Sequence, residues 1–193
     1  MDVILPFLTM MCNCSIREAQ LPASQKRSIL HPVLKRDGLD VEDPVNYRPI
    51  ANVTFLSKIL QRIIANQLLA YLDGNGLLPS YQSGFRKNHS TETLILRLFS
   101  YLYGAMDTGL ISLLALFDVS SAFDCVDHDI LLQRLSTSFG LMDQPLAWLR
   151  SFLSERTNSV LFGTSRSVWV PAPFGVPQGS VWDHCFMLFI RLA

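Results

Sequence analysis

The feature that most constrains the fold is an apolar run from Leu110 to Phe117 that ends in a single carboxylate, Asp118. The run is short and shows no helical face, so it predicts a buried strand. A carboxylate at the end of such a strand cannot be covered by the core without a partner. It can instead project into a cleft and bind a hard cation through oxygen. The sequence therefore predicts a strand that delivers Asp118 to a cleft.

Helical and extended patterns alternate irregularly along the rest of the chain. After Thr54, apolar residues recur at helical spacing as far as Asp73, which predicts a long amphipathic helix. Ser90 or Thr91 predicts the start of a second helix that runs to about Ala105. Further helices are predicted over 128–139, over 145–154 and from 180 onward, and two strands over 157–162 and 167–171. Because there is no regular βαβ period, the expected fold class is α+β.

Composition excludes several classes of protein. The chain has 193 residues, 49% hydrophobic and 17% charged, so it can build a core and is too apolar for disorder. Basic and acidic residues number 16 each, so only local clusters could favour nucleic acid. No apolar span reaches the ~18 residues of a transmembrane helix, and no membrane partner is expected. The scattered cysteines fit free thiols in a reducing compartment better than a zinc site.

A group of acidic residues follows Asp118. Asp127 and Asp129 are interpreted as a solvated helix start, where acids are favourable, while Asp124 serves local structure or nucleotide positioning. The spacing does not fit a calcium-binding EF-hand loop. Neighbouring His128 is interpreted as a capping or surface residue. Two-metal phosphoryl transfer needs a second source of carboxylates, which Asp118 alone cannot supply.

Downstream, Gly175-Val-Pro-Gln-Gly-Ser180 combines a fixed φ at proline with flexible glycines and an amide side chain. Alone it predicts an ordinary turn; together with the Asp118 segment it indicates a site. Arg86 and Arg48 lie in loops with aromatic neighbours, and Lys58 lies on the first long helix. These cations are either solvated charges or contacts to phosphate.

Successive blocks of this sequence resemble the reverse transcriptase domain of non-LTR (LINE-type) retrotransposons, with the CR1/L2-like group as the nearest match. The blocks are 46–50 (NYRPI), 56–60 (LSKIL), 82–86 (QSGFR), 89–93 (HSTET), 122–128 (AFDCVDH) and 175–180 (GVPQGS). The resemblance implies a right-hand polymerase with fingers and a partial palm. Residues 1–45 would be a lead-in segment, and residues 46–193 the reverse transcriptase domain.

The resemblance also implies roles for particular residues. Asp118 would be the catalytic metal ligand for Mg²⁺, and Val119 could offer its backbone carbonyl to the second ion. Phe123 would stack under the sugar and select dNTPs, and Gln178 would line the nucleotide pocket. The cations Arg86, Arg48 and Lys58 would grip the triphosphate or the nucleic acid. The implied partners are an RNA template, a DNA primer and dNTPs, in the cytoplasm or nucleus.

The resemblance breaks after Val181, where Trp182 and the residues behind it replace the family pattern. The sequence contains no Tyr-x-Asp-Asp, so we expect the second catalytic carboxylate pair and the thumb to be missing from this chain. We therefore expect a truncated reverse transcriptase that is inactive as this chain. The alternatives are a remnant that binds RNA without chemistry, and a pseudogene-like product without function.

Overall fold

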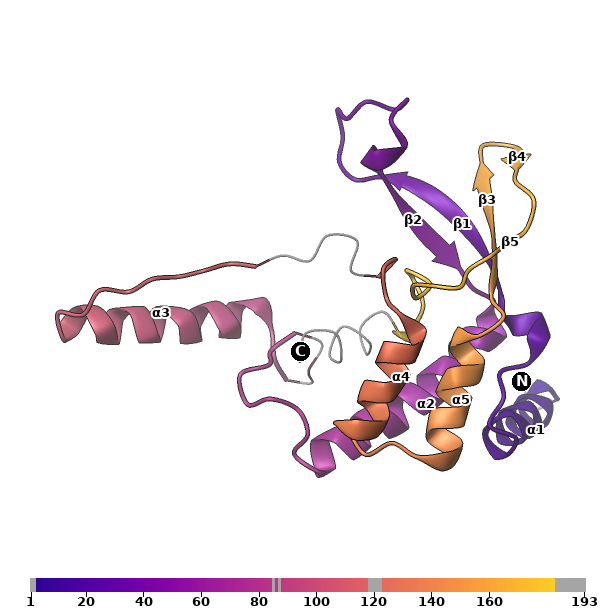
Figure 1. The fold of residues 1–193 in the computed structure, drawn as a ribbon, viewed down its shortest axis with the longest axis horizontal. Helices are drawn as coiled ribbons and strands as arrows, with labels where there is room; N and C mark the ends of the chain where they lie inside the picture. The colour runs from indigo at the N-terminus through magenta and orange to yellow at the C-terminus, as the bar shows by residue number, and fades with distance from the viewer. Residues whose placement is uncertain (1–2, 85, 87, 118–122, 183–193) are drawn as a thin grey trace.

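The computed structural model describes residues 3–84, 86, 88–117 and 123–182. In chain order the elements are α1 (Ile4–Arg17), a 3₁₀ turn (Ala23–Gln25), β1 (Arg27–Leu34), a 3₁₀ turn (Pro44–Asn46), β2 (Tyr47–Asn52), α2 (Phe55–Gly74), α3 (Thr91–Asp107), α4 (His128–Thr137), α5 (Asp143–Leu153), β3 (Thr157–Phe162), β4 (Ser165–Arg166) and β5 (Val170–Pro171). This mixture of helices and one sheet agrees with the α+β expectation (Figure 1). The division into fingers and palm stays a prediction.

The sheet joins segments that are distant in sequence. Its strand order is β2-β1-β3-β4, and β5 pairs with β3. β1 runs antiparallel to β2, with Val33 opposite Arg48, and parallel to β3, with Arg27 beside Thr157. β3 matches the strand predicted over 157–162 and pairs with β4 across a tight turn. Of the second predicted strand, over 167–171, only β5 at its end is extended and paired, whereas β4 lies just before it.

The core lies among α2, α4 and α5, which pack below the sheet in Figure 1. α2 begins where the sequence predicts: Thr54 caps it by accepting a hydrogen bond from the Ser57 amide. Its buried apolar positions recur at helical spacing, which is why this segment folds as a helix against a core. The rings of Trp148, Phe152 and Trp182 are fully buried, with centroids about 6 Å apart.

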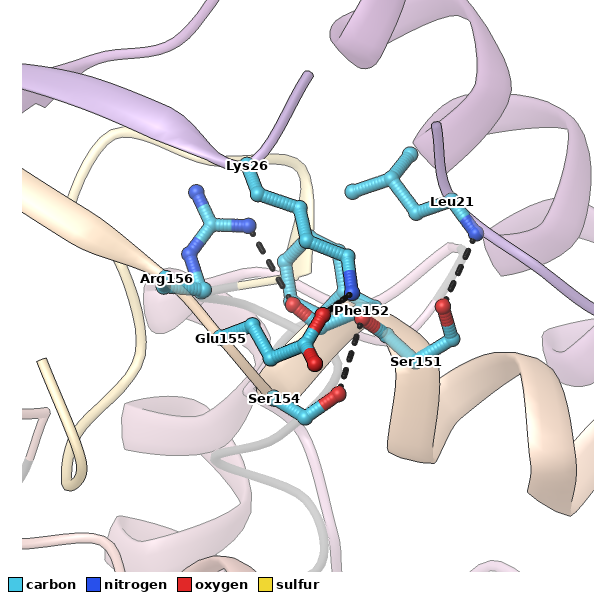
Figure 2. A network of polar contacts seen from close by, with 7 residues as sticks. All are labelled: Leu21, Lys26, Ser151, Phe152, Ser154, Glu155 and Arg156. Carbon is cyan, nitrogen blue, oxygen red and sulfur yellow. Dashed lines mark hydrogen bonds and ion pairs between the residues drawn. The ribbon is translucent and has the colours of Figure 1, made fainter. Parts of the chain in front are cut away.

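The N-terminal segment packs on the same body. The Trp148 indole N–H donates to Ser15 Oγ of α1 at 3.0 Å, and the Leu21 amide donates to Ser151 Oγ at 3.1 Å. Lys26 pairs with Glu155 at 3.2 Å, so the chain before β1 is joined to the end of α5 (Figure 2). A domain boundary at residue 45 stays a prediction, while α1 and β1, which precede it, pack on elements that follow it.

The predicted strand over 110–117 is wrong. These residues have no regular secondary structure, and Ile111, Leu113 and Phe117 are each more than 90% exposed. The adjoining α3 has no buried residue, and Figure 1 shows both segments extending away from the sheet. The physical reason is that a strand needs a neighbour for its backbone groups, and no described residue pairs with this run. Asp118 itself lies outside the described residues, as does most of the predicted helix after residue 180.

Among the residues that the structure describes, no helix has both the length and the apolarity needed to cross a bilayer.

Candidate functional site

The glycine-rich loop predicted from the sequence lies directly against the segment that follows Asp118. The Gly175 amide donates to the Val126 carbonyl at 2.9 Å, and the Val176 amide donates to the Phe123 carbonyl at 2.8 Å. Two segments about fifty residues apart are therefore joined through their backbones. This brings Phe123 close to the loop that carries Gln178. Their predicted closeness to Asp118 cannot be described, because Asp118 lies outside the described residues.

Gly175 is required for this close approach. Its φ is +79°, a region that side-chain-bearing residues adopt only with strain, and a Cβ atom here would lie 2.9 Å from the Asp124 carbonyl oxygen. The carbonyl of Gly175 accepts from His128, whose Nε2 lies 2.7 Å away. The interpretation of His128 as a cap or surface residue is therefore wrong: Asp127 caps α4, and His128 is half-buried and fixes the loop.

The other end of the loop is tied to β2 and α2. The Gln178 carbonyl accepts from the Ala51 amide, and the Val181 amide donates to Gln61 Oε1 at 3.0 Å. Gly179 has a φ of +100°, and a Cβ there would lie 3.0 Å from the Ala51 carbonyl oxygen. The loop is thus held at both ends by backbone geometry that only glycine fits without strain.

A small cavity of about 90 Å³ lies beside the loop. Its walls include Pro49 of β2, Asp124, Asn158 of β3, and Gln178 of the loop, with Arg156 at the start of β3. A volume of this size holds a few water molecules and not a nucleotide. The cavity can therefore form only part of a nucleotide site.

Arg156 is the residue in this cavity that sequence reasoning missed. It is 3% exposed, and it donates to the Phe152 carbonyl at 3.2 Å and to Ser28 Oγ at 2.9 Å; Figure 2 shows the first of these bonds. Burial lowers its pKa to about 10, so it stays charged at neutral pH. Its Nε and the Asn158 Oδ1 are both buried and lack a hydrogen-bond partner among the described residues. Nothing in the sequence distinguished it from a surface arginine after a helix.

The acidic residues from 124 to 129 differ in their surroundings. Asp127 Oδ1 accepts from the amides of Asp129 and Ile130 at 2.9 and 3.0 Å, and Asp129 is exposed and lies 3.8 Å from Arg150. Both therefore serve the start of α4. Asp124 instead lines the cavity, and burial raises the pKa of its carboxyl even though the side chain still reaches solvent. No group of three metal-ligating side chains occurs among the described residues.

The sequence from residue 33 to residue 188 matches the family described as reverse transcriptase (RNA-dependent DNA polymerase). The chain belongs to this family. It is 32% identical over 180 residues to the RNA-directed DNA polymerase from mobile element jockey of Drosophila melanogaster, covering 93% of this chain and 19% of the relative. It is also 32% identical over 175 residues to the probable RNA-directed DNA polymerase from transposon BS of the same species, covering 91% of this chain and 19% of that relative.

A third relative is the retrovirus-related Pol polyprotein from type-1 retrotransposable element R2 of Popillia japonica. It is 30% identical over 162 residues, which covers 82% of this chain and 21% of the relative. The relatives are polymerases of non-LTR retrotransposons, which confirms the resemblance at that level. The chain spans about a fifth of the length of the relatives it matches. The finer placement among CR1/L2-like elements stays a prediction.

The basic residues that are predicted to contact a triphosphate or nucleic acid do not gather around the cavity. Arg86 is engaged elsewhere: it donates to the Pro79 carbonyl at 3.1 Å and lies 3.7 Å from Asp73. Arg48 on β2 and Lys58 on α2 are exposed. Because Pro49 lines the cavity and neighbouring residues of a strand face opposite ways, Arg48 lies on the other face of the sheet. The roles of all three stay predictions, as do those of Asp118 and Val119 outside the described residues.

Proposed function

We propose that this chain is the fingers and part of the palm of a LINE-type RNA-directed DNA polymerase. The observation that supports the proposal best is the backbone pairing of the loop at 175–178 with residues 123–126, in a chain of the reverse transcriptase family. This pairing joins the segment after Asp118 to the loop that carries Gln178. Those are the two segments that a nucleotide site of this family requires.

In this proposal each site residue has one task. Asp118 and the Val119 carbonyl supply hard oxygen ligands, which suit Mg²⁺. When bound, the ion would neutralise charge on the phosphates of a dNTP. Phe123 stacks under the sugar and excludes a 2′-hydroxyl, and Gln178 contacts the nucleotide. Arg86 would have to leave its contacts near Asp73 in order to reach a triphosphate.

The nucleic-acid partners follow from the same assignment. An RNA template and a DNA primer would contact the exposed cations Arg48 and Lys58. Their guanidinium and ammonium groups form no ion pair with a described residue, so both are available to phosphates.

Binding of a fluorescent dNTP to the purified chain tests the proposal. We expect saturable binding that requires Mg²⁺, is lost in Asp118→Ala, and is unchanged in the matched control Asp129→Ala at the exposed start of α4. Phe123→Ala should bind ribonucleotides and deoxyribonucleotides more equally. Binding that is the same in Asp118→Ala as in the wild type would contradict the assignment.

Templated DNA synthesis is not expected from the 193-residue chain by itself, because it contains no Tyr-x-Asp-Asp. Without that carboxylate pair the second metal ion has no adequate ligands, and metal clamping of both reacting oxygens is lost. Primer extension that disappears in Asp118→Ala would overturn this expectation. Extension restored by a family-like tail carrying Tyr-x-Asp-Asp and a thumb would support it.

A second candidate function is RNA binding without chemistry. Its supporting observation is that exposed arginines lie on the sheet while the sequence contains no second carboxylate pair. Salt-dependent RNA binding without binding of dNTP would favour this candidate over the first. A chain that binds neither and shows no cooperative unfolding would favour the third possibility, a product without function.

A further inference from the structure

Two arginine side chains are held on one tryptophan ring at the sheet. The guanidinium carbon of Arg166 lies 4.7 Å from the centre of the Trp169 ring, and that of Arg27 lies 5.5 Å from it. Both distances fall within the range of cation–π attraction. Trp169 is 39% exposed, and both arginines are exposed, so this cluster is a surface feature.

The cluster has a defined position and orientation. Arg166 Nε donates to Ser159 Oγ at 3.1 Å, and Ser159 Oγ in turn donates to the Ser167 carbonyl at 2.9 Å. On β1, Ser28 is fully buried and bonds to Arg156, which lines the cavity described above. Since side chains alternate along a strand, Arg27 projects from the opposite face of the sheet. The cluster is therefore separate from the candidate site.

Arg48 belongs to the same face. It pairs with Val33, which lies an even number of residues from Arg27 on β1, so both arginines project to the same side. Arg27 and Val33 lie six residues apart on the extended strand, so Arg27 and Arg48 are separated along it by about 20 Å. We call Arg27, Arg48, Arg166 and Trp169 the arginine face.

The charges of the arginine face are not balanced within the described residues. The ion pairs among the described residues involve other cations, namely Lys26, Arg86 and Arg150. The chain as a whole has no net charge, so a group of arginines that lacks a carboxylate partner among the described residues is a local excess of positive charge. Two guanidinium groups on one ring also repel each other, a cost that a bound anion would remove.

We propose that the arginine face binds the phosphate backbone of single-stranded RNA. The planar guanidinium matches phosphate oxygens with two parallel hydrogen bonds, and a span of about 20 Å accommodates several successive phosphates. The Trp169 ring already supports guanidinium groups, so it positions them and does not stack with a base. The contact is therefore independent of base sequence. Only the choice of RNA as the polyanion rests on the proposed function.

Fluorescence anisotropy of a labelled single-stranded RNA of mixed sequence tests the proposal across a series of salt concentrations. We expect Arg27→Ala/Arg166→Ala to bind roughly ten-fold more weakly and to lower the slope of log K against log salt by about 1.4, as two lost single-strand phosphate contacts require. The matched control Arg17→Ala/Arg150→Ala removes the same charge from exposed positions of α1 and α5, and should bind as the wild type.

An unchanged affinity in Arg27→Ala/Arg166→Ala would overturn the proposal, as would an equal loss in the control. Displacement of the RNA by polyglutamate as readily as by unlabelled RNA would also overturn it, because the face would then recognise any polyanion. Binding of dNTP with Mg²⁺ is measured in parallel on the same variant. If dNTP binding persists while the RNA result fails, the arginine face is wrong and the proposed polymerase site is not affected.

Discussion

At the scale of single residues, Gly175 is the position where backbone geometry controls the candidate site. Gly175→Ala places a Cβ 2.9 Å from the Asp124 carbonyl oxygen, at a φ of +79°. We expect strain of roughly 1–2 kcal/mol from the left-handed backbone, and a further ~1–3 kcal/mol from the clash. Urea denaturation followed by tryptophan fluorescence measures the total.

Gly163→Ala is the matched control, because Gly163 also has a positive φ, +58°, yet nothing lies within 4 Å of its Cβ position. Its free energy of unfolding should fall only by the strain of the left-handed backbone, roughly 1–2 kcal/mol. Equal losses in the two variants would show that the loop does not press against the segment at 123–126.

Asp124 gives a prediction about pH. Burial raises the pKa of its carboxyl in the folded chain above the unfolded value of about 3.9. Between the two pKa values the folded chain binds the proton more tightly, so this group favours folding as the pH falls. Above both values the ionised carboxylate opposes folding.

Asp124→Asn, which imitates the neutral carboxyl, should therefore be more stable than the wild type at pH 7. The difference should vanish below about pH 3.9, where both forms of the chain carry a neutral group. Urea unfolding at the two pH values provides the measurement. A difference of the same size at both would mean that the substitution acts through shape and not through charge.

The sequence predicts which two segments form the site but not all of the side chains that line or fix it. The family resemblance predicts that Gln178 and Phe123 belong to one site, and their segments lie together in the structure. Arg156 and His128 could not be found in this way. Their roles depend on burial and on partners in distant segments, which no local pattern encodes.

At the scale of elements, α1 is predicted to stabilise the rest of the molecule. Ser15→Ala removes the acceptor of the buried Trp148 indole N–H, and an unsatisfied buried donor costs about 1–3 kcal/mol. The loss should appear as a shift of one cooperative unfolding transition, because α1 packs on α5.

Trp148→Phe provides the second arm of this experiment. Ser15→Ala should cost much less when it is made in a Trp148→Phe background, where no indole N–H remains. If α1 instead unfolds separately, with a transition of its own, it does not form part of the core described here.

Helix starts could be predicted where a capping residue provides a strong local signal. α2 begins after Thr54, where the helical pattern starts, and α3 is capped by Ser90, one of the two caps that the sequence left open. The prediction of a strand over 110–117 failed because hydrophobicity shows only a preference for burial. Whether a strand forms depends on a pairing partner, and none is present among the described residues.

At the scale of the whole molecule, α3 and the run at 110–117 leave a large apolar surface open, and such surfaces promote association. We expect the purified chain to self-associate as its concentration rises. Ile111→Lys/Leu113→Lys should suppress this in sedimentation velocity, while the free energy of unfolding changes by no more than about 0.5 kcal/mol.

The control for this experiment is Val41→Lys/Val45→Lys, which adds the same charge to exposed positions between β1 and β2. It should associate as the wild type does. Association that persists in Ile111→Lys/Leu113→Lys would place the responsible surface elsewhere.

The central claim is that the segment after Asp118 and the loop at 175–180 form one nucleotide site. Photolabelling with an azido-dATP in the presence of Mg²⁺, followed by mass spectrometry of the peptides, tests it most directly. We predict label on peptides from both segments, competed by unlabelled dATP and absent in Asp118→Ala. Label confined to other parts of the chain, or label unaffected by Asp118→Ala, would contradict the claim.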